Sequence, residues 1–177
     1  MTAGIVRIGE SPRALEIQVE GRGTMLHSQA IRQWAEVRVL SIARVRVDLS
    51  RCTHMDSTFV GTLLCLKRLS ESRPGGGLVL VGPSVQCLQV LEQMRIGRIF
   101  AVDPECPVGC DWQEVQIDPC AAKTLAFKST VVEAHQHLAD CPGPAGDRFR
   151  QLADDMAREL ARETAGKTAQ PGERGSA

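Results

Sequence analysis

Residues 44–69 hold a strand-like pattern followed directly by a helix-like pattern, and this order constrains the fold more than any other feature of the chain. Apolar and charged residues alternate over residues 44–49, which is the period of a half-buried strand. Residues 50–55 are expected to form a short connection. Apolar residues then recur at the spacing of an amphipathic helix, at Phe59, Val60, Leu63, Leu64, Leu66 and Leu69.

Asp56 and Ser57 stand between this strand and this helix. Both residue types favour a helix N-cap, because a short side-chain oxygen can accept a hydrogen bond from a free amide of the first turn. Unpaired N–H groups and the positive end of the helix dipole meet at the same place, and together they favour an added phosphate. The pattern therefore leaves two interpretations of Ser57, a simple helix cap or a residue that carries a phosphate.

Strand-like and helix-like segments alternate along the first hundred residues. The expected strands are residues 4–8, 14–20, 44–49, 78–81 and 99–102, and the expected helices are residues 29–42 after Ser28, the helix after Ser57 and the helix after Ser84. Parallel strands need helical crossovers between them, and this alternation supplies those crossovers. The sequence therefore predicts an α/β domain.

Four short motifs follow one another in this part of the chain. They are Val45-Arg46-Val47-Asp48-Leu49, Met55-Asp56-Ser57-Thr58, Gly61-Thr62-Leu63-Leu64, and Gly77-Leu78-Val79-Leu80-Val81-Gly82-Pro83-Ser84, with Leu88, Leu91, Ile96 and Phe100 behind the last. In order and spacing they resemble the STAS domain of bacterial anti-sigma factor antagonists, over about residues 4–103. The resemblance implies a mixed β-sheet with helices packed mainly on one face. Family members usually carry Gly-Leu-Gly where this chain has Phe59-Val60-Gly61.

In that family the serine directly after the aspartate is the phosphoacceptor, and Ser57 holds this position. The resemblance implies a regulatory module that binds an anti-sigma factor or a serine kinase of the histidine-kinase-like ATPase type and is switched by phosphorylation at Ser57. Asp56, Thr58, Phe59 and Gly61 are the expected motif and partner-binding residues. The alternative is a STAS scaffold that is never phosphorylated, in a signalling complex or a lipid-transporter assembly.

The sequence offers weak grounds for an enzyme. A relay between Ser57 and His54 would need two residues only three positions apart to face each other across a turn. The Gly-x-Ser-x-Gly motif, which marks one class of hydrolases, is absent. We therefore expect neither catalytic residues nor a cofactor.

Cysteine and histidine residues in the second half of the chain raise the question of a metal site. Cys106, Cys110 and Cys120, with His135 and His137 further on, lack the paired Cys-x2-Cys spacing that is typical of zinc sites. The two histidines are separated by one residue, so on a helix their rings point to different sides. We expect no metal site, and we expect both histidines to be solvated.

Charge and composition limit the classes of partner. The chain has 21 basic and 21 acidic residues, so electrostatics give no reason to expect binding to nucleic acid or to an anionic membrane. No apolar run reaches the roughly 18 residues of a membrane helix, and the first ten residues show no apolar signal segment. The seven cysteines are an odd number, which argues against a disulfide framework. We therefore expect a cytoplasmic protein without membrane insertion.

The composition changes after Val102, which divides the chain into three expected parts. They are a STAS-like domain over residues 1–108, a C-terminal helical extension over residues 109–165 and a disordered tail over residues 166–177. Helices are expected over residues 120–139 and 147–163, and the second has an apolar stripe of Phe149, Leu152, Met156 and Leu160. We expect the two helices to form a hairpin that packs on the domain or on a second copy, which would make a homodimer.

Overall fold

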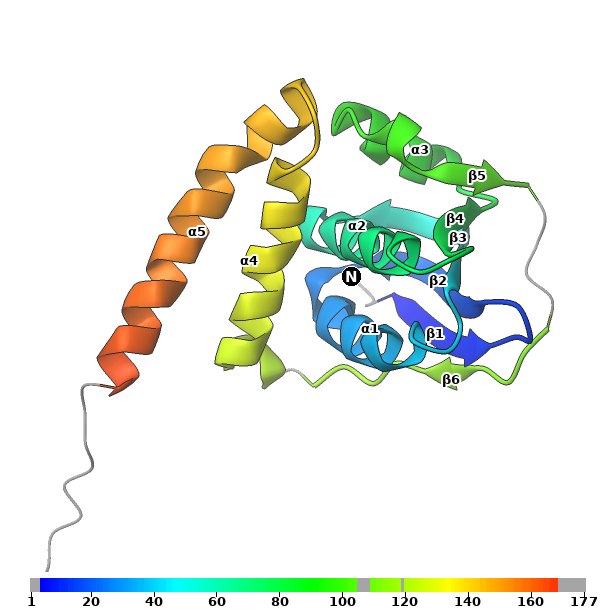
Figure 1. Cartoon of the computed structure of the whole chain (residues 1–177), viewed down its shortest axis with the longest axis horizontal. Helices are drawn as coiled ribbons and strands as arrows, with labels where there is room; N and C mark the ends of the chain where they lie inside the picture. Colours follow the sequence, from blue (N-terminus) through cyan, green and yellow to red (C-terminus); the bar gives the residue numbers. More distant parts are fainter. Residues whose placement is uncertain (1–3, 105–108, 119, 169–177) are drawn as a thin grey trace, which may run out of the picture.

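The computed structural model describes residues 4–104, 109–118 and 120–168. In this part of the chain a single β-sheet carries three helices, and a helical hairpin lies beside them (Figure 1). The strands are β1 (Ile5–Glu10), β2 (Leu15–Gly23), β3 (Arg44–Met55), β4 (Gly77–Val81), β5 (Ala101–Asp103) and β6 (Gln113–Glu114). The helices are α1 (Met25–Arg38), α2 (Ser57–Glu71), α3 (Val85–Gln93), α4 (Leu125–Ala139) and α5 (Pro144–Thr168), with 3-10 turns η1 (Gly97–Ile99) and η2 (Ala121–Lys123).

The sheet is mixed, with the strand order β5-β4-β3-β2-β1-β6. Strands β2 to β5 pair in parallel, whereas β1 is antiparallel to both β2 and β6. Val47 lies opposite Ile17 of β2 and Leu80 of β4, so these apolar side chains share one face of the sheet. All three are fully buried. The expected mixed α/β sheet is thus confirmed.

The opposite face of the sheet is polar. Arg7 of β1 donates hydrogen bonds to Gln18 and Glu20 of β2, and Gln18 in turn donates to Asp48 of β3. Charged side chains lie on this polar face, whereas core residues of α1, α2 and α3 pack against the apolar face. The helices therefore cover mainly one face of the sheet. The prediction of a one-sided arrangement is therefore confirmed.

Strand β3 is longer than expected. It continues through residues 50–55, which were expected to form a connection, and it ends at Met55. These residues lack a clear apolar alternation, but they pair with the end of β2, where Cys52 lies opposite Gly21 and His54 opposite Arg22. Pairing with a neighbouring strand thus overrides the weak local pattern, and the strand leads directly into Asp56 and α2.

Helix α1 begins earlier than expected. Its N-cap is Thr24, whose N–H donates to Nδ1 of His27, so Ser28 lies inside the helix rather than at its start. The prediction for α3 is confirmed, since Ser84 is the N-cap and its hydroxyl accepts a hydrogen bond from the N–H of Cys87. The start of α1 was predicted one turn too late, because Thr24 and Ser28 are both acceptable N-caps and stand one turn apart.

Strand β6 lies at the far edge of the sheet, next to β1 (Figure 1). Its residue Glu114 pairs with Arg7, and the N–H of the following Val115 donates to the carbonyl of Val6. Val115 is buried and belongs to the hydrophobic core. The segment that leads from the STAS-like part to the C-terminal helices therefore contributes to the sheet.

The C-terminal helices form the expected hairpin, and α4 packs across α1 and α2 while α5 packs on the outside of α4 (Figure 1). Helix α5 is longer than expected and runs from Pro144 to Thr168. Most of the expected tail, residues 169–177, lies outside the described residues. In the described part of the chain, no helix combines the length and the apolar character that crossing a membrane requires.

Candidate functional site

Asp56 joins the starts of two helices. Its Oδ1 accepts a hydrogen bond from the N–H of Phe59 in α2, and its Oδ2 accepts one from the N–H of Met25 in α1, both at 2.8 Å. Its own N–H donates to the carbonyl of Gly23 at the end of β2. One carboxylate thus satisfies free amides of both helices. The N-cap at this junction is Asp56, and Ser57 is the first residue of α2.

Replacing Asp56 with alanine should lower the free energy of unfolding by about 0.5–2 kcal/mol, because the carboxylate's hydrogen bonds to the starts of both helices are lost. Replacement with asparagine keeps one acceptor oxygen and should cost less. Urea denaturation of the full chain measures both changes. Equal stability of the alanine variant and the wild type would contradict the double-capping role.

His27, in the first turn of α1, is buried and neutral. Its Nδ1 accepts the N–H of Thr24, so its Nε2 carries the proton and donates to the carbonyl of Gly4 at 3.1 Å. Burial lowers the pKa of His27 below its ordinary value of 6.5. The folded protein therefore binds a proton here less readily than the unfolded chain does.

Stability should consequently fall as the pH drops below about 6.5. Above that pH both states hold His27 neutral and its contribution is complete; below it, the unfolded state takes up the proton first. Urea midpoints of the wild type at pH 7.5 and pH 5.5 measure the loss, and His27→Gln should show a smaller change between the two pH values. An identical change in both proteins would exclude His27 as a source of the pH dependence.

The hydroxyl of Ser57 contacts a histidine that sequence reasoning did not connect with it. Ser57 Oγ lies 3.0 Å from Nε2 of His135 in α4. Nδ1 of His135 lies 2.8 Å from the carbonyl oxygen of Val131, which can only accept, so Nδ1 carries the proton and Nε2 accepts the Ser57 hydroxyl. His135 is 5% exposed and its ring packs against that of Phe149 in α5, with the centroids 6.4 Å apart.

The expectation that His135 and His137 are solvated was wrong. His135 is buried, and His137 is partly buried beside the guanidinium of Arg68. Both face inward because α4 packs across α2 and α1, which the pattern of an isolated helix does not reveal. His54 is partly exposed and makes no contact with Ser57 among the interactions of the described residues.

The other expected site residues point away from solvent. Phe59 is fully buried with its ring against Gly23, where an added Cβ would come within 2.8 Å of a ring carbon. Thr58 is 4% exposed. Gly61 is buried beneath α4, and a Cβ added to it would lie 2.2 Å from the carbonyl oxygen of Ala134. Only Asp56 and Ser57 of the expected residues remain partly accessible.

One face of α2 lies against the C-terminal hairpin. Its residues are Ser57, Gly61, Cys65 and Arg68, spaced by four, four and three positions, and we refer to them as the α2 stripe. The guanidinium of Arg68 donates to the Asp140 carboxylate at 2.8 Å and to the carbonyl of His137 at 3.2 Å. Burial raises the pKa of the Cys65 thiol. The candidate site is therefore covered by a helix of the same chain.

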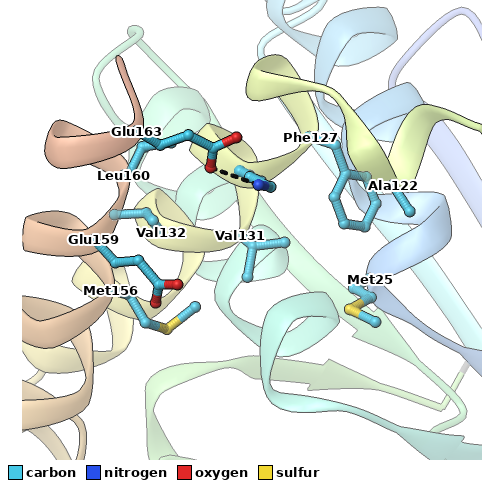
Figure 2. A pocket seen from close by; sticks show the side chains of 10 residues that line it. Met25, Ala122, Phe127, Val131, Val132, Met156, Glu159, Leu160 and Glu163 are labelled. Atoms are coloured by element: carbon cyan, nitrogen blue, oxygen red, sulfur yellow. Dashed lines mark hydrogen bonds and ion pairs between the residues drawn. The ribbon is translucent and has the colours of Figure 1, made fainter. Parts of the chain in front are cut away.

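A pocket of about 250 Å³ lies beside this site, between the start of α1 and helices α4 and α5 (Figure 2). The side chains that line it are Met25, Ala122, Phe127, Lys128, Val131, Val132, Met156, Glu159, Leu160 and Glu163. Its wall is mostly apolar, and an ion pair between Lys128 and Glu163 crosses it. Met25 and Val131 connect it to the site, since their backbone groups bond Asp56 and His135. The pocket can accept an apolar group.

The cysteines and histidines considered for zinc do not come together in the described residues. Within residues 4–104, 109–118 and 120–168, no three His, Cys, Asp or Glu side chains gather where they could hold a metal ion. Cys110 lies against Gly9, and Cys120 is exposed. Cys106 lies outside the described residues.

Comparison with known proteins identifies the family. A profile described as "Mlab, STAS domain" matches residues 6–102, more than half of the chain. No curated protein matches the sequence.

The solved structures that resemble the chain do so at low identity. The anti-sigma factor antagonist SpoIIAA in its unphosphorylated form is 19% identical, with a TM-score of 0.49 over 56% of this chain and 89% of that one. The Bacillus cell fate determinant SpoIIAA in its phosphorylated form is also 19% identical, with a TM-score of 0.47 over 56% and 92%. The protein TM1081 is 17% identical, with a TM-score of 0.49 over 54% and 78%. On the strength of the profile match, the chain belongs to the STAS domain family.

Proposed function

We propose that this protein is a regulatory binding module, which binds an anti-sigma factor or a serine kinase of the histidine-kinase-like ATPase type through the start of α2. Phosphorylation of Ser57 is the switch. The observation that carries the proposal is the position of Ser57 in this STAS domain, as the first residue of α2 directly after the Asp56 cap. Free amides and the helix dipole favour a phosphate there.

A phosphate on Ser57 would weaken binding by electrostatics and desolvation, without a change of fold. It adds a charge of about −1.5 to −2 and three acceptor oxygens beside the carboxylate of Asp56. A partner that covers this surface must desolvate that charge. Each 1.4 kcal/mol of lost binding free energy lowers the affinity about tenfold.

Mass spectrometry tests the switch. The full chain is incubated with ATP, Mg²⁺ and a serine kinase of the histidine-kinase-like ATPase type, and the modified residue is located by fragmentation. We expect phosphate on Ser57 in the wild type and in Thr58→Ala, and none in Ser57→Ala. Phosphate on another residue, or on none, would contradict the assignment of Ser57.

A second function is favoured by the hydrogen bond between Ser57 and the buried His135. A hydroxyl held in this way suits a STAS scaffold that is never phosphorylated, in a signalling complex or a lipid-transporter assembly. For such a scaffold, Ser57→Ala would keep its partner and the wild type would stay unmodified. The phosphorylation experiment therefore separates the two functions.

A further inference from the structure

We propose that the hairpin α4–α5 is an intramolecular cover of the α2 stripe, which a partner or a kinase must displace to reach Ser57. The proposal rests on the proposed function, in which this end of α2 meets the partner. It adds that the free protein occupies the binding face with its own C-terminal helix. The cover would make the availability of Ser57 depend on the position of α4.

The first argument is steric. At Gly61 the two helices approach so closely that even a Cβ would lie 2.2 Å from the Ala134 carbonyl oxygen and 2.9 Å from the Ala134 Cα. A second protein cannot insert between them. Ser57 is also occupied, because its hydroxyl donates to His135. For phosphoryl transfer, the phosphoryl donor must come within about 3–3.5 Å of the Ser57 hydroxyl oxygen. Nε2 of His135 already occupies a position at 3.0 Å from that oxygen.

The second argument concerns the strength of the attachment. Charged pairs near the surface hold α4 at two points: Arg68 bonds Asp140, whose side chain is 64% exposed, and Arg32 of α1 bonds Glu133. Such pairs contribute little and are weakened by salt. Leu138 of α4 also belongs to the hydrophobic core and is fully buried, so displacing the hairpin uncovers it. The pairing of β2, β3 and β4 does not involve the hairpin and can persist when α4 moves.

These contacts also describe the partner. A competitor for the α2 stripe must offer what α4 offers, namely a helix with a small residue opposite Gly61 and a carboxylate opposite Arg68. Ala134 and Asp140 fill these two roles in the free protein. A helical segment of this kind on an anti-sigma factor or a kinase would match the exposed stripe.

Native cysteines provide reporters for the opening. Cys65 belongs to the α2 stripe and is half-buried, with the charged side chains of Arg32 and Glu36 of α1 and of Glu133 of α4 around it. Cys120 is exposed and gives the rate of an unprotected thiol. Cys52 and Cys87 are fully buried between β3 and α3, away from the hairpin, so they react only if the domain itself unfolds. Alkylation followed by peptide mass spectrometry distinguishes the four sites.

The experiment compares full-length Asp140→Arg with the wild type and with Asp154→Arg, which changes an exposed carboxylate on α5 by the same amount of charge. We expect N-ethylmaleimide to modify Cys65 at least fivefold faster in Asp140→Arg, with no change in Asp154→Arg and no reaction of Cys52 or Cys87. The rate of Ser57 phosphorylation should rise in the same variant. Gly61→Ala is a second means of lifting α4 and should act in the same direction.

Each outcome bears on one hypothesis. The cover is refuted if Cys65 reacts at the wild-type rate in both Asp140→Arg and Gly61→Ala. It is also refuted if Cys65 becomes reactive while Ser57 is phosphorylated equally fast in all proteins. If Cys65 becomes reactive and no protein is phosphorylated at all, the cover of the α2 stripe is supported and the phosphorylation switch is contradicted.

Discussion

Replacing Phe59 with alanine is expected to lower the free energy of unfolding by about 3–5 kcal/mol. The ring is fully buried, in the first turn of α2, and it lies directly over Gly23, where the three atoms nearest to an added Cβ are all ring carbons of Phe59. Truncation would leave a cavity between helix and sheet, since neither β2 nor β3 can move inward without breaking its pairing. Urea denaturation followed by circular dichroism measures the loss.

Phe149 offers a matched control, because it is a phenylalanine on α5 that is only partly buried. Phe149→Ala should cost clearly less than Phe59→Ala and should affect mainly the hairpin. Equal losses would mean that Phe59 is not the central contact between α2 and the sheet. The result also concerns the family motif. Phe59 stands where family members usually carry a glycine, and its side chain points into the core rather than toward a partner.

Replacing Gly61 with alanine is expected to destabilise the attachment of α4 by about 1–3 kcal/mol, because the new Cβ overlaps the backbone of Ala134. Alanine is the better helix former by about 1 kcal/mol, so propensity alone would predict stabilisation. The sign of the effect thus reports the helix contact. Gly166→Ala is the control, since a Cβ at Gly166 in α5 meets nothing within 4 Å.

Hydrogen exchange measures where the change occurs. In Gly61→Ala the amides of α4 should exchange faster, whereas those of β3 and β4 should keep their protection. Gly166→Ala should be as stable as the wild type or slightly more so. Unchanged exchange of α4 in Gly61→Ala would show that the helices adjust without separating.

The fold of the first hundred residues was largely predictable, because its signals are local. Alternation in residues 44–49 and the apolar run in residues 78–81 each reflect burial of a strand, and the STAS motifs fix their order. The extension of β3 to Met55 was not predictable from its own residues. It depends on pairing with the end of β2, a contact between segments that a window of sequence does not include.

The site was predictable only in part. The position of Ser57 at a helix start follows from local sequence, but its bond to His135 joins residues that are 78 positions apart. No periodicity links them, and His135 was expected to be solvated although it shares a side of its helix with Val131, Val132 and Leu138. One signal was available, since Gly61 lies in the middle of a helix where glycine is unfavourable, and such a glycine often marks the close approach of another backbone.

The position of β6 has a consequence for the order in which the chain folds. Its pairing with β1 joins residue 114 to residue 7, so almost the whole domain is enclosed between the two paired segments. The entropy cost of closing a loop rises only slowly with its length, so a loop of this size costs little more than a shorter one. Contacts between residues so far apart in the sequence nevertheless form slowly. During synthesis, β1 remains an open sheet edge until β6 has left the ribosome, and an open edge is prone to pair with another chain. Strand β6, which follows the other described strands in the chain, therefore covers part of the edge of β1.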